Sequence, residues 1–451
     1  MRASVQVPHI LLLALLGCGR SQHVVPVSAP PDDRSGTDAG VAVQPPPSPD
    51  GGQPSTPDAG DQSQPPTCLA SPVLADLGAE QRLLVGADMS ESVAELAPFD
   101  IRYLYLAGGL ADGDGPCARC DSSCTAGGVS CSASSGPTCG WWGCWQDPAL
   151  PPGEYARDLL RRTQAAGQIP LISYYELLQT TKVTEGSAEI VALRDVALMT
   201  RYFNDWRFVL GQIGKSRALL HVEPDLWGYA EQVGADPHLI AAAVRAANPT
   251  DCAGHEDSVA GLGRCLIAMV RKYAPSAKVG LHASAWGTGV DVHENTDSRL
   301  DVAAEGRRLA DFLLACGAGD SDFVVVEASD RDAGFYKSIG RATFWDATNA
   351  TLPNFRQAFA WTRAVTERIG HPALFWQLPL GNMSLPNVTY QWQDNRVDYF
   401  FSHPGEVAST NAFGMVFGAG AEGQTNPSTD RGNFVTRVQQ LAAAGGQAAC
   451  Q

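Results

Sequence analysis

Residues 218–232 read ALLHVEPDLWGYAEQ, and this stretch places two acids where an apolar strand should end. The run Ala218–Glu223 is rich in Leu and Val, as a buried strand is. Glu223 and Asp225 are separated only by a proline, and Trp227 follows them. Because burying an unpaired carboxylate is unfavourable, these acids must be solvated, paired or used in chemistry.

Similar apolar runs recur along the chain, with helical segments between most of them. We expect eight strands, at Leu83–Asp88, Tyr103–Ala107, Ile169–Tyr174, Ala218–Glu223, Lys278–His282, Phe323–Glu327, Ala373–Gln377 and Phe413–Phe417. Apolar residues three and four apart predict helices over 155–166, 190–213, 259–273, 302–316, 355–369 and 434–444, and a short helix near 93–96.

Continuous apolar strands that alternate with helices indicate an α/β fold with a parallel, helix-covered sheet. Eight such units predict a closed (β/α)8 TIM-like barrel over residues 68–451, with a disulfide-rich insertion at 110–150 after the second strand. A Rossmann-like sheet would need a G-x-G-x-x-G turn after the first strand, and that turn reads GADMSES.

The first 67 residues have the character of a targeting segment and a linker. An apolar run at 10–16 ends in Leu-Leu-Gly-Cys, which resembles the lipobox of bacterial lipoproteins. The resemblance implies a signal peptide over 1–18, lipid on Cys18, and an exported lipoprotein of the bacterial outer membrane or cell surface. The alternative is a simple secretory signal. Residues 19–67 contain no Phe, Tyr or Trp and predict a disordered Pro/Asp/Gly-rich tether.

The net charge of −16 argues against a nucleic-acid partner, because phosphate binding needs clustered cations. Twelve cysteines fit an exported protein. We expect pairs Cys68–Cys450 and Cys252–Cys265, and leave Cys316 as a buried free thiol. Six cysteines in the insertion predict three disulfides, with zinc or an iron–sulfur cluster as the alternative: Cys117, Cys120, Cys124, Cys131, Cys139 and Cys144.

Polar and acidic residues follow seven of the eight predicted strands. In (β/α)8 barrels the carboxyl ends of the strands form the active-site rim. Acids and amides beside tryptophans are typical of a sugar site, since aromatic rings stack on sugars and carboxylates bond their hydroxyls. We expect substrate contacts from Asp88, Tyr175, Glu176, Trp227, His282, Trp286, Asp330, Asp332, Trp376 and Gln377, and catalysis from Glu223, Asp225 and Glu327.

Three motifs carry a resemblance to the cellulases of glycoside hydrolase family 6: VEPD at 222–225, LHASAWG at 281–287 and VVVEASDRDAG at 324–334. The resemblance covers residues 218–335 and implies that Asp225 is the general acid, with Glu223 a buried partner. Residues 169–177 read IPLISYYEL, which departs from the family's upstream strand end, and the family's late carboxylate motif has no counterpart.

The chain also resembles the large clan of retaining barrel glycosidases. That resemblance implies that Glu223 is the acid/base and Glu327 the nucleophile. The clan takes its nucleophile from the seventh strand, whereas Glu327 closes the sixth predicted strand.

Structural roles remain open for each candidate. Glu223 could pair with an arginine such as Arg102, and Asp225 could cap the next helix. His282 could be a hydrogen-bonded core histidine. Asp330 and Asp332 could belong to a solvated turn.

No His-x-His spacing follows the first strand, so we expect neither metal nor cofactor. The sequence predicts an exported, lipid-anchored and monomeric glycoside hydrolase acting on a poly- or oligosaccharide. The alternatives are a carbohydrate-binding or adhesion lipoprotein, and another lyase or hydrolase on the same barrel.

Overall fold

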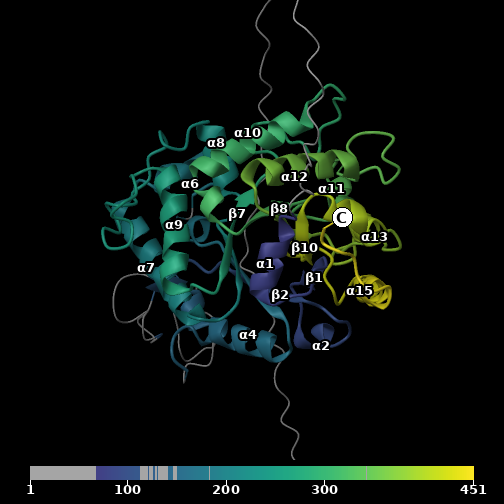
Figure 1. The fold of residues 1–451 in the computed structure, drawn as a ribbon, viewed down its shortest axis with the longest axis horizontal. Coiled ribbons are helices and arrows are strands. Elements are labelled where there is room, and N and C mark those ends of the chain that lie inside the picture. The colour runs from purple at the N-terminus through teal and green to yellow at the C-terminus, as the bar shows by residue number, and fades with distance from the viewer. Residues whose placement is uncertain are drawn as a thin grey trace, which may run out of the picture. The chain divides into compact units, whose positions relative to one another are not determined.

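The computed structural model describes residues 68–111, 120, 125–126, 129–130, 141–145, 150–181, 183–341 and 343–450. Over these residues the chain forms a closed, eight-stranded parallel barrel in the order β1-β10-β9-β8-β7-β6-β5-β2 (Figure 1). Its strands are β1 (Leu84–Ala87), β2 (Ile101–Leu106), β5 (Ile169–Tyr174), β6 (Leu219–Val222), β7 (Lys278–Ala283), β8 (Phe323–Glu327), β9 (Ala373–Leu378) and β10 (Ala412–Phe417). A two-stranded antiparallel ribbon, β3 (Thr125–Ala126) and β4 (Val129–Ser130), lies in the insertion.

The barrel confirms the fold class and all eight predicted strands. The largest error is at β2, which begins at Ile101, two residues earlier than expected. Ile101 and Arg102 pair with Gly86 and Ala87 of β1 as well as with β5, so pairing on both sides extends this strand.

Helices surround the barrel, as Figure 1 shows. They are α1 (Ala70–Leu77), α2 (Glu91–Ala94), α4 (Glu154–Ala165), α5 (Leu177–Thr181), α6 (Ser187–Ala192), α7 (Val196–Ile213), α8 (Leu226–Val233), α9 (Val259–Tyr273), α10 (Val302–Ala315), α11 (Ala333–Ser338), α12 (Phe355–Ile369), α13 (Arg396–Ser402), α14 (Pro404–Ala408) and α15 (Asn433–Ala443), with short 3₁₀ turns η2 (Trp142–Cys144) and η3 (Ala318–Asp320).

One predicted helix, 190–213, is wrong as a single element. The structure divides it into α6 and α7 because Asp195 caps the second helix. The side chain of Asp195 accepts hydrogen bonds from the backbone N–H groups of Ala197 and Leu198, which otherwise lack partners at a helix start.

The inside of the barrel is apolar at its amino-terminal end. There α1 contributes Val73 and Leu74 to a cluster with inward-facing strand residues such as Leu84, Leu219 and Phe413. The helix therefore closes this end of the barrel, and the label of α1 lies over the centre of the barrel in Figure 1. Polar groups are left to the opposite, carboxyl-terminal end.

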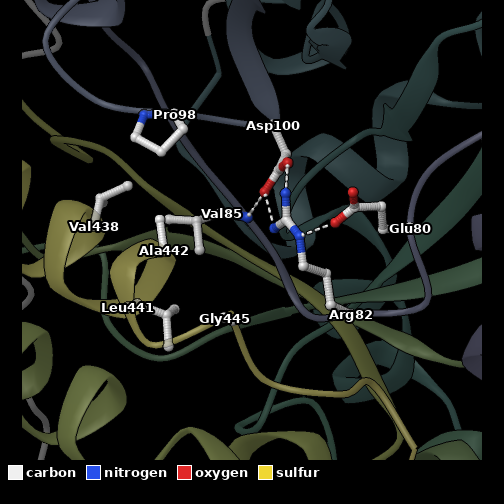
Figure 2. Close-up of a pocket in the computed structure, with 10 residues that line it drawn as sticks. Glu80, Arg82, Val85, Pro98, Asp100, Val438, Leu441, Ala442 and Gly445 are labelled. Atoms are coloured by element: carbon white, nitrogen blue, oxygen red, sulfur yellow. Dashed lines mark hydrogen bonds and ion pairs between the residues drawn. The ribbon is translucent and has the colours of Figure 1, made fainter.

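An ion pair also stabilises the amino-terminal end. Arg82, just before β1, donates to both carboxylate oxygens of Asp100, at 2.8 and 2.6 Å, and to Glu80 at 2.8 Å (Figure 2). Asp100 also accepts from the backbone N–H of Val85 at 2.9 Å. The pocket around this pair lies at the end of the barrel remote from the acidic strand ends, and its guanidinium is already bound by two carboxylates.

Three disulfides join described residues: Cys68–Cys450, Cys252–Cys265 and Cys120–Cys144. The first two confirm the expected pairs, and Cys316 is a buried free thiol as expected. Cys117, Cys124, Cys131 and Cys139 lie outside the described residues, so their pairing stays a prediction.

The expected signal peptide with Cys18 and the expected tether over 19–67 also lie outside the described residues. Within the described part of the chain, no helix combines the length and the apolar character needed to cross a membrane.

Candidate functional site

Three neighbouring strands bring Asp225, His282 and Glu327 together at the carboxyl-terminal end of the barrel. Asp225 follows β6, His282 lies near the end of β7, and Glu327 ends β8. One nitrogen of the histidine and one oxygen of each acid lie within 4.8 Å of one another. A cluster whose members span about 100 positions of sequence thus forms at one place, because parallel strands end at the same rim.

The backbone at Asp225 is held in an uncommon conformation. Its φ is 67°, in the left-handed region that non-glycine residues rarely adopt. Asp225 precedes α8, but its side chain makes no capping hydrogen bond, so the capping alternative is wrong. The side chain is instead 28% exposed at the rim, and its Oδ1 lies 3.9 Å from Nε2 of His282.

The environment of Asp225 favours its protonated form. Burial raises the pKa of Asp225 to about 8, and the like charges of Glu185 and Asp330 add to the shift. Solvent still reaches part of the side chain, as a group that exchanges a proton with substrate requires.

Glu327 is held by one amide donor. Burial raises the pKa of Glu327, as do the charges of Asp225 and Asp330, whereas the Gln377 amide and Arg331 lower it. The Nε2 of Gln377 donates to Oε1 of Glu327 at 2.8 Å. Two carboxyls this close hold one proton between them, and the Gln377 amide partly offsets the effect of burial on Glu327.

A bulge in β9 aims Gln377 at Glu327. The register between β10 and β9 shifts between Met415 and Phe417, and Gln377 lies opposite this shift with φ 53°. A bulge re-aims a side chain without ending the strand. Gln377 is therefore placed by the sheet and not by a flexible loop.

Glu223 lies apart from this pair. It is fully buried, and its Oε1 accepts a hydrogen bond from the backbone N–H of Glu176 at 3.2 Å. Burial raises the pKa of Glu223 to about 8. The Arg102 alternative is wrong, because Arg102 lies 3.6 Å from Glu91. Of the two acids in the opening stretch, Asp225 is the one at the solvent-accessible rim.

The tryptophans expected to contact sugar are not equivalent. Trp227 has no exposed surface, and its Nε1 donates to the carbonyl of Val222 at 3.0 Å, so it is a core residue in this structure. Trp376 is 1% exposed and packs edge-on against His282 inside the barrel. Trp286 is partly exposed and packs on Tyr229 with ring centroids 4.6 Å apart, which leaves it able to stack on a ligand.

Of the other residues expected to contact substrate, Asp332 has a structural role, whereas Tyr175 lies near the acid pair. Asp332 is 1% exposed and accepts from the N–H groups of Gly381 and Thr425, at 2.9 and 2.8 Å, so it joins two rim loops. The Tyr175 hydroxyl donates to Glu185 at 3.3 Å near the acid pair.

Three more of the expected contacts lie in different settings. Glu176 is fully buried, Asp88 is exposed after β1, and Asp330 is partly exposed beside Arg331 and Tyr336.

Several residues that face the site were missed from the sequence. They are Tyr105, Ser173, Glu185, Glu189 and His221. Tyr105, Ser173 and His221 occupy inward positions near the ends of their strands, and the period-two alternation of each strand could have identified them. Glu185 and Glu189 come from the connection between β5 and α7, where no periodic signal marks a site.

The cluster of Asp225, His282 and Glu327 is compact enough to hold either a shared proton or a bound cation between its atoms. Its oxygen and nitrogen atoms are of the kinds that transition-metal ions accept. A shared proton and a bound cation would each relieve the repulsion between the carboxylates of Asp225 and Glu327, and a metal-binding experiment distinguishes the two.

No protein-family model matches the chain, and no curated protein sequence matches it either. Solved structures with a similar fold include a family 26 endo-β-1,4-mannanase from Cellulomonas fimi (11% identity, 84% of this chain and 74% of that one, TM-score 0.44). An endo-1,4-β-D-mannanase from Thermotoga petrophila is 12% identical over 80% of this chain and 99% of that one, with a TM-score of 0.43.

The endoglucanase Cel6 from Mycobacterium tuberculosis is 15% identical, and the similarity spans 50% of this chain and 56% of that one, with a TM-score of 0.28. These similar structures are glycoside hydrolases. At such low identity and TM-score, the function of this chain has to be argued from its own site.

Proposed function

We propose that this chain is a glycoside hydrolase that cleaves a poly- or oligosaccharide, with Asp225 as general acid/base and Glu327 as nucleophile. The observation that carries the proposal is the approach of one Asp225 oxygen to within 4.8 Å of a Glu327 oxygen at the barrel rim. Retaining glycosidases place two carboxyl groups about 5–5.5 Å apart, and inverting enzymes about 6.5–9.5 Å apart. The spacing favours the retaining mechanism.

The two acids have environments suited to different roles. Burial raises the pKa of both acids, so exposure and hydrogen bonding assign the roles. Asp225, 28% exposed at the rim, protonates the glycosidic oxygen as the leaving group departs. Glu327, held by Gln377, attacks the anomeric carbon and forms a glycosyl-enzyme. Asp225, now ionised, takes a proton from water, and this water hydrolyses the intermediate.

The charge around the pair restricts the substrate. Glu185, Asp225, Glu327 and Asp330 gather near one arginine, Arg331, which is paired with Asp330. This excess of acids disfavours anionic glycans such as polyuronates. An uncharged or amino-substituted polysaccharide fits better, with Trp286 as a stacking surface.

Substrates that differ in their leaving group distinguish the roles of Asp225 and Glu327. Asp225→Asn should lose about 10²–10⁴-fold in kcat/KM on polysaccharide, yet keep most of its kcat/KM on aryl glycosides whose leaving group needs no protonation. Its kcat should fall on both substrates, because hydrolysis of the glycosyl-enzyme then lacks the base that activates water. Glu327→Gln should lose activity on both substrates, and mass spectrometry of wild type with a slow fluoro-glycoside should find the label on Glu327. Glu223→Gln is the matched control, because its carboxyl lies outside the pair.

The soluble domain from Cys68 onward is the protein to assay, against β-glucans, xylan, mannan and peptidoglycan. Equal activity of wild type and both pair variants would exclude this assignment. Binding of a glycan without any release of sugar would favour the alternative, a carbohydrate-binding or adhesion protein on the same barrel.

We also propose that the protein is exported, lipid-anchored and monomeric. Three disulfides among the described residues fit an oxidising compartment, and the Leu-Leu-Gly-Cys motif supports export with a lipid on Cys18. The protein would then act as a monomer held at a bacterial surface. Labelling with a fatty-acid analogue, with Cys18→Ser as control, and light scattering of the soluble domain check both statements.

A further inference from the structure

A line of polar side chains crosses the inside of the barrel beneath the acid pair. Ser173 of β5, His221 of β6 and His282 of β7 are all fully buried. The strand register aligns them, since Ser173 pairs with His221 and His221 pairs with Gly280, two residues before His282. Each therefore points inward from a neighbouring strand.

These side chains are joined by short hydrogen bonds. Ser173 Oγ lies 2.9 Å from Nδ1 of His221, and Nε2 of His221 lies 3.0 Å from Nδ1 of His282. Nε2 of His282 has no hydrogen-bond partner among the described residues, and it lies 3.9 Å from Oδ1 of Asp225. The line therefore leads to Asp225.

The tautomers of the two rings are linked. Burial lowers the pKa of His282 to about 3 and lowers that of His221 as well, so both rings are neutral. A neutral imidazole has one N–H and one lone pair. In the hydrogen bond between His221 and His282, one ring nitrogen donates and the other accepts. The direction of this hydrogen bond therefore fixes the tautomer of both rings.

We propose that Ser173, His221 and His282 form a directed hydrogen-bond chain that holds the Nε2–H of His282 toward the carboxylate of Asp225. In this direction the Ser173 hydroxyl donates to His221, and the Nε2–H of His221 donates to His282. The inference rests on the proposed role of Asp225 as the acid/base. The three residues act as positioning residues, not as catalytic ones.

Electrostatics select this direction. The groups that face Asp225 are His282 from β7, Glu327 from β8, Asp330 after β8, Tyr105 from β2, Tyr175 after β5, Glu185 before α6, Glu189 from α6 and Tyr229 from α8. Apart from the neutral His282 and three tyrosines these groups are acids, so once Asp225 is ionised an N–H directed at it is favourable and a lone pair is not. The 3.9 Å from Nε2 of His282 to Oδ1 of Asp225 is about 1 Å longer than an ordinary hydrogen bond, so a small approach of the two groups would form one.

The chain therefore limits the upward shift of the Asp225 pKa. Without it, the ionised form that activates water would lose the N–H that His282 directs at it. The alkaline limb of the pH–rate profile reports this pKa, because Asp225 must be protonated for the first step. Loss of the donor destabilises the carboxylate, so this limb should move to higher pH.

Two variants of His282 give a matched comparison. His282→Asn cannot place a donor at the Nε2 position, and its alkaline limb should rise by about one pH unit. His282→Gln can place an amide N–H there and should keep the wild-type profile. Ser173→Ala, which does not touch Asp225, should move the limb in the same direction as His282→Asn.

Nitrogen NMR of the wild-type soluble domain tests the inference without any substrate. Both rings should be neutral and protonated on Nε2 at pH 9, where Asp225 is ionised, and the carbon-13 titration of Asp225 should shift upward in His282→Asn. Protonation of both rings on Nδ1, or an unmoved Asp225 titration, would overturn the directed chain whatever the activity. Stoichiometric Zn²⁺ binding that both shifts the His282 resonance and is required for turnover would overturn it in favour of a metal site.

Discussion

Asp225, Glu223 and Gln377 share a feature that sequence does not reveal, since all three have positive φ, at 67°, 46° and 53°. A left-handed conformation costs a non-glycine residue about 1–3 kcal/mol and persists only where its surroundings impose it. Here it occurs at the ends of β6 and β9, where it directs Asp225 to the rim and Gln377 to Glu327. Strain at these positions is consistent with selection for the site and not for stability.

Gln377 offers a test at the residue scale. Gln377→Met removes the 2.8 Å hydrogen bond to Glu327, which favours the ionised form. The pKa of Glu327 should therefore rise, and the acidic limb of the pH–rate profile should move up by about one pH unit. Gln393→Met makes the same chemical change away from the pair, and a similar movement of its acidic limb would argue against the assignment.

At the scale of elements, the connections that follow the strands bring several of the acids to the site. The segment between β5 and α7 supplies both Glu185 and Glu189, and Glu189 lies on α6. Glu189 is 1% exposed, and its Oε1 has no hydrogen-bond partner among the described residues. Burial raises the pKa of Glu189 to about 9, with contributions from Glu223, Glu185 and Asp225.

Glu189 makes stability depend on pH. Because its folded pKa exceeds the unfolded value, the native state binds more protons between about pH 4.5 and 9, and stability falls as pH rises through that window. Glu189→Gln should change the unfolding free energy little near pH 5 and raise it at pH 8 by up to about 4 kcal/mol, since each pH unit in the window contributes about 1.4 kcal/mol.

Urea unfolding at both pH values checks the Glu189 prediction, and the exposed Glu95→Gln serves as control. Destabilisation of Glu189→Gln at pH 8 would mean that the carboxylate makes a favourable contact in the native protein.

For the whole molecule, closure of the barrel requires the two ends of the described chain to meet. The last strand, β10, pairs with the first, β1, and Cys68 is joined to Cys450 across 382 residues. Because α1 closes the amino-terminal end next to Cys68, this disulfide holds α1 against the barrel.

Removal of that disulfide should destabilise the molecule. Cys68→Ser with Cys450→Ser should lower the unfolding free energy by about 2–5 kcal/mol. Cys252→Ser with Cys265→Ser is the matched comparison, and its loss should be smaller because that loop spans only 13 residues. Chemical denaturation measures both, and an equal loss would assign the effect to local strain and not to chain entropy.

The sequence by itself determined the barrel. Each strand is a local apolar run and each major helix has its own 3.6-residue period, so eight alternating units could be counted and closed without coordinates. The same local reasoning placed Asp225, His282 and Glu327 at strand ends, and it paired Cys68 with Cys450 and Cys252 with Cys265.

Only the tertiary structure decided which acid of the opening stretch reaches the rim. Glu223 and Asp225 are two residues apart in sequence, and their different burial depends on a turn with positive φ and on packing against β5. The burial of Trp227, the approach of Gln377 to Glu327 and the line from Ser173 to His282 likewise depend on contacts between strands. Such contacts follow from register and side-chain packing across the barrel, which a linear pattern does not encode.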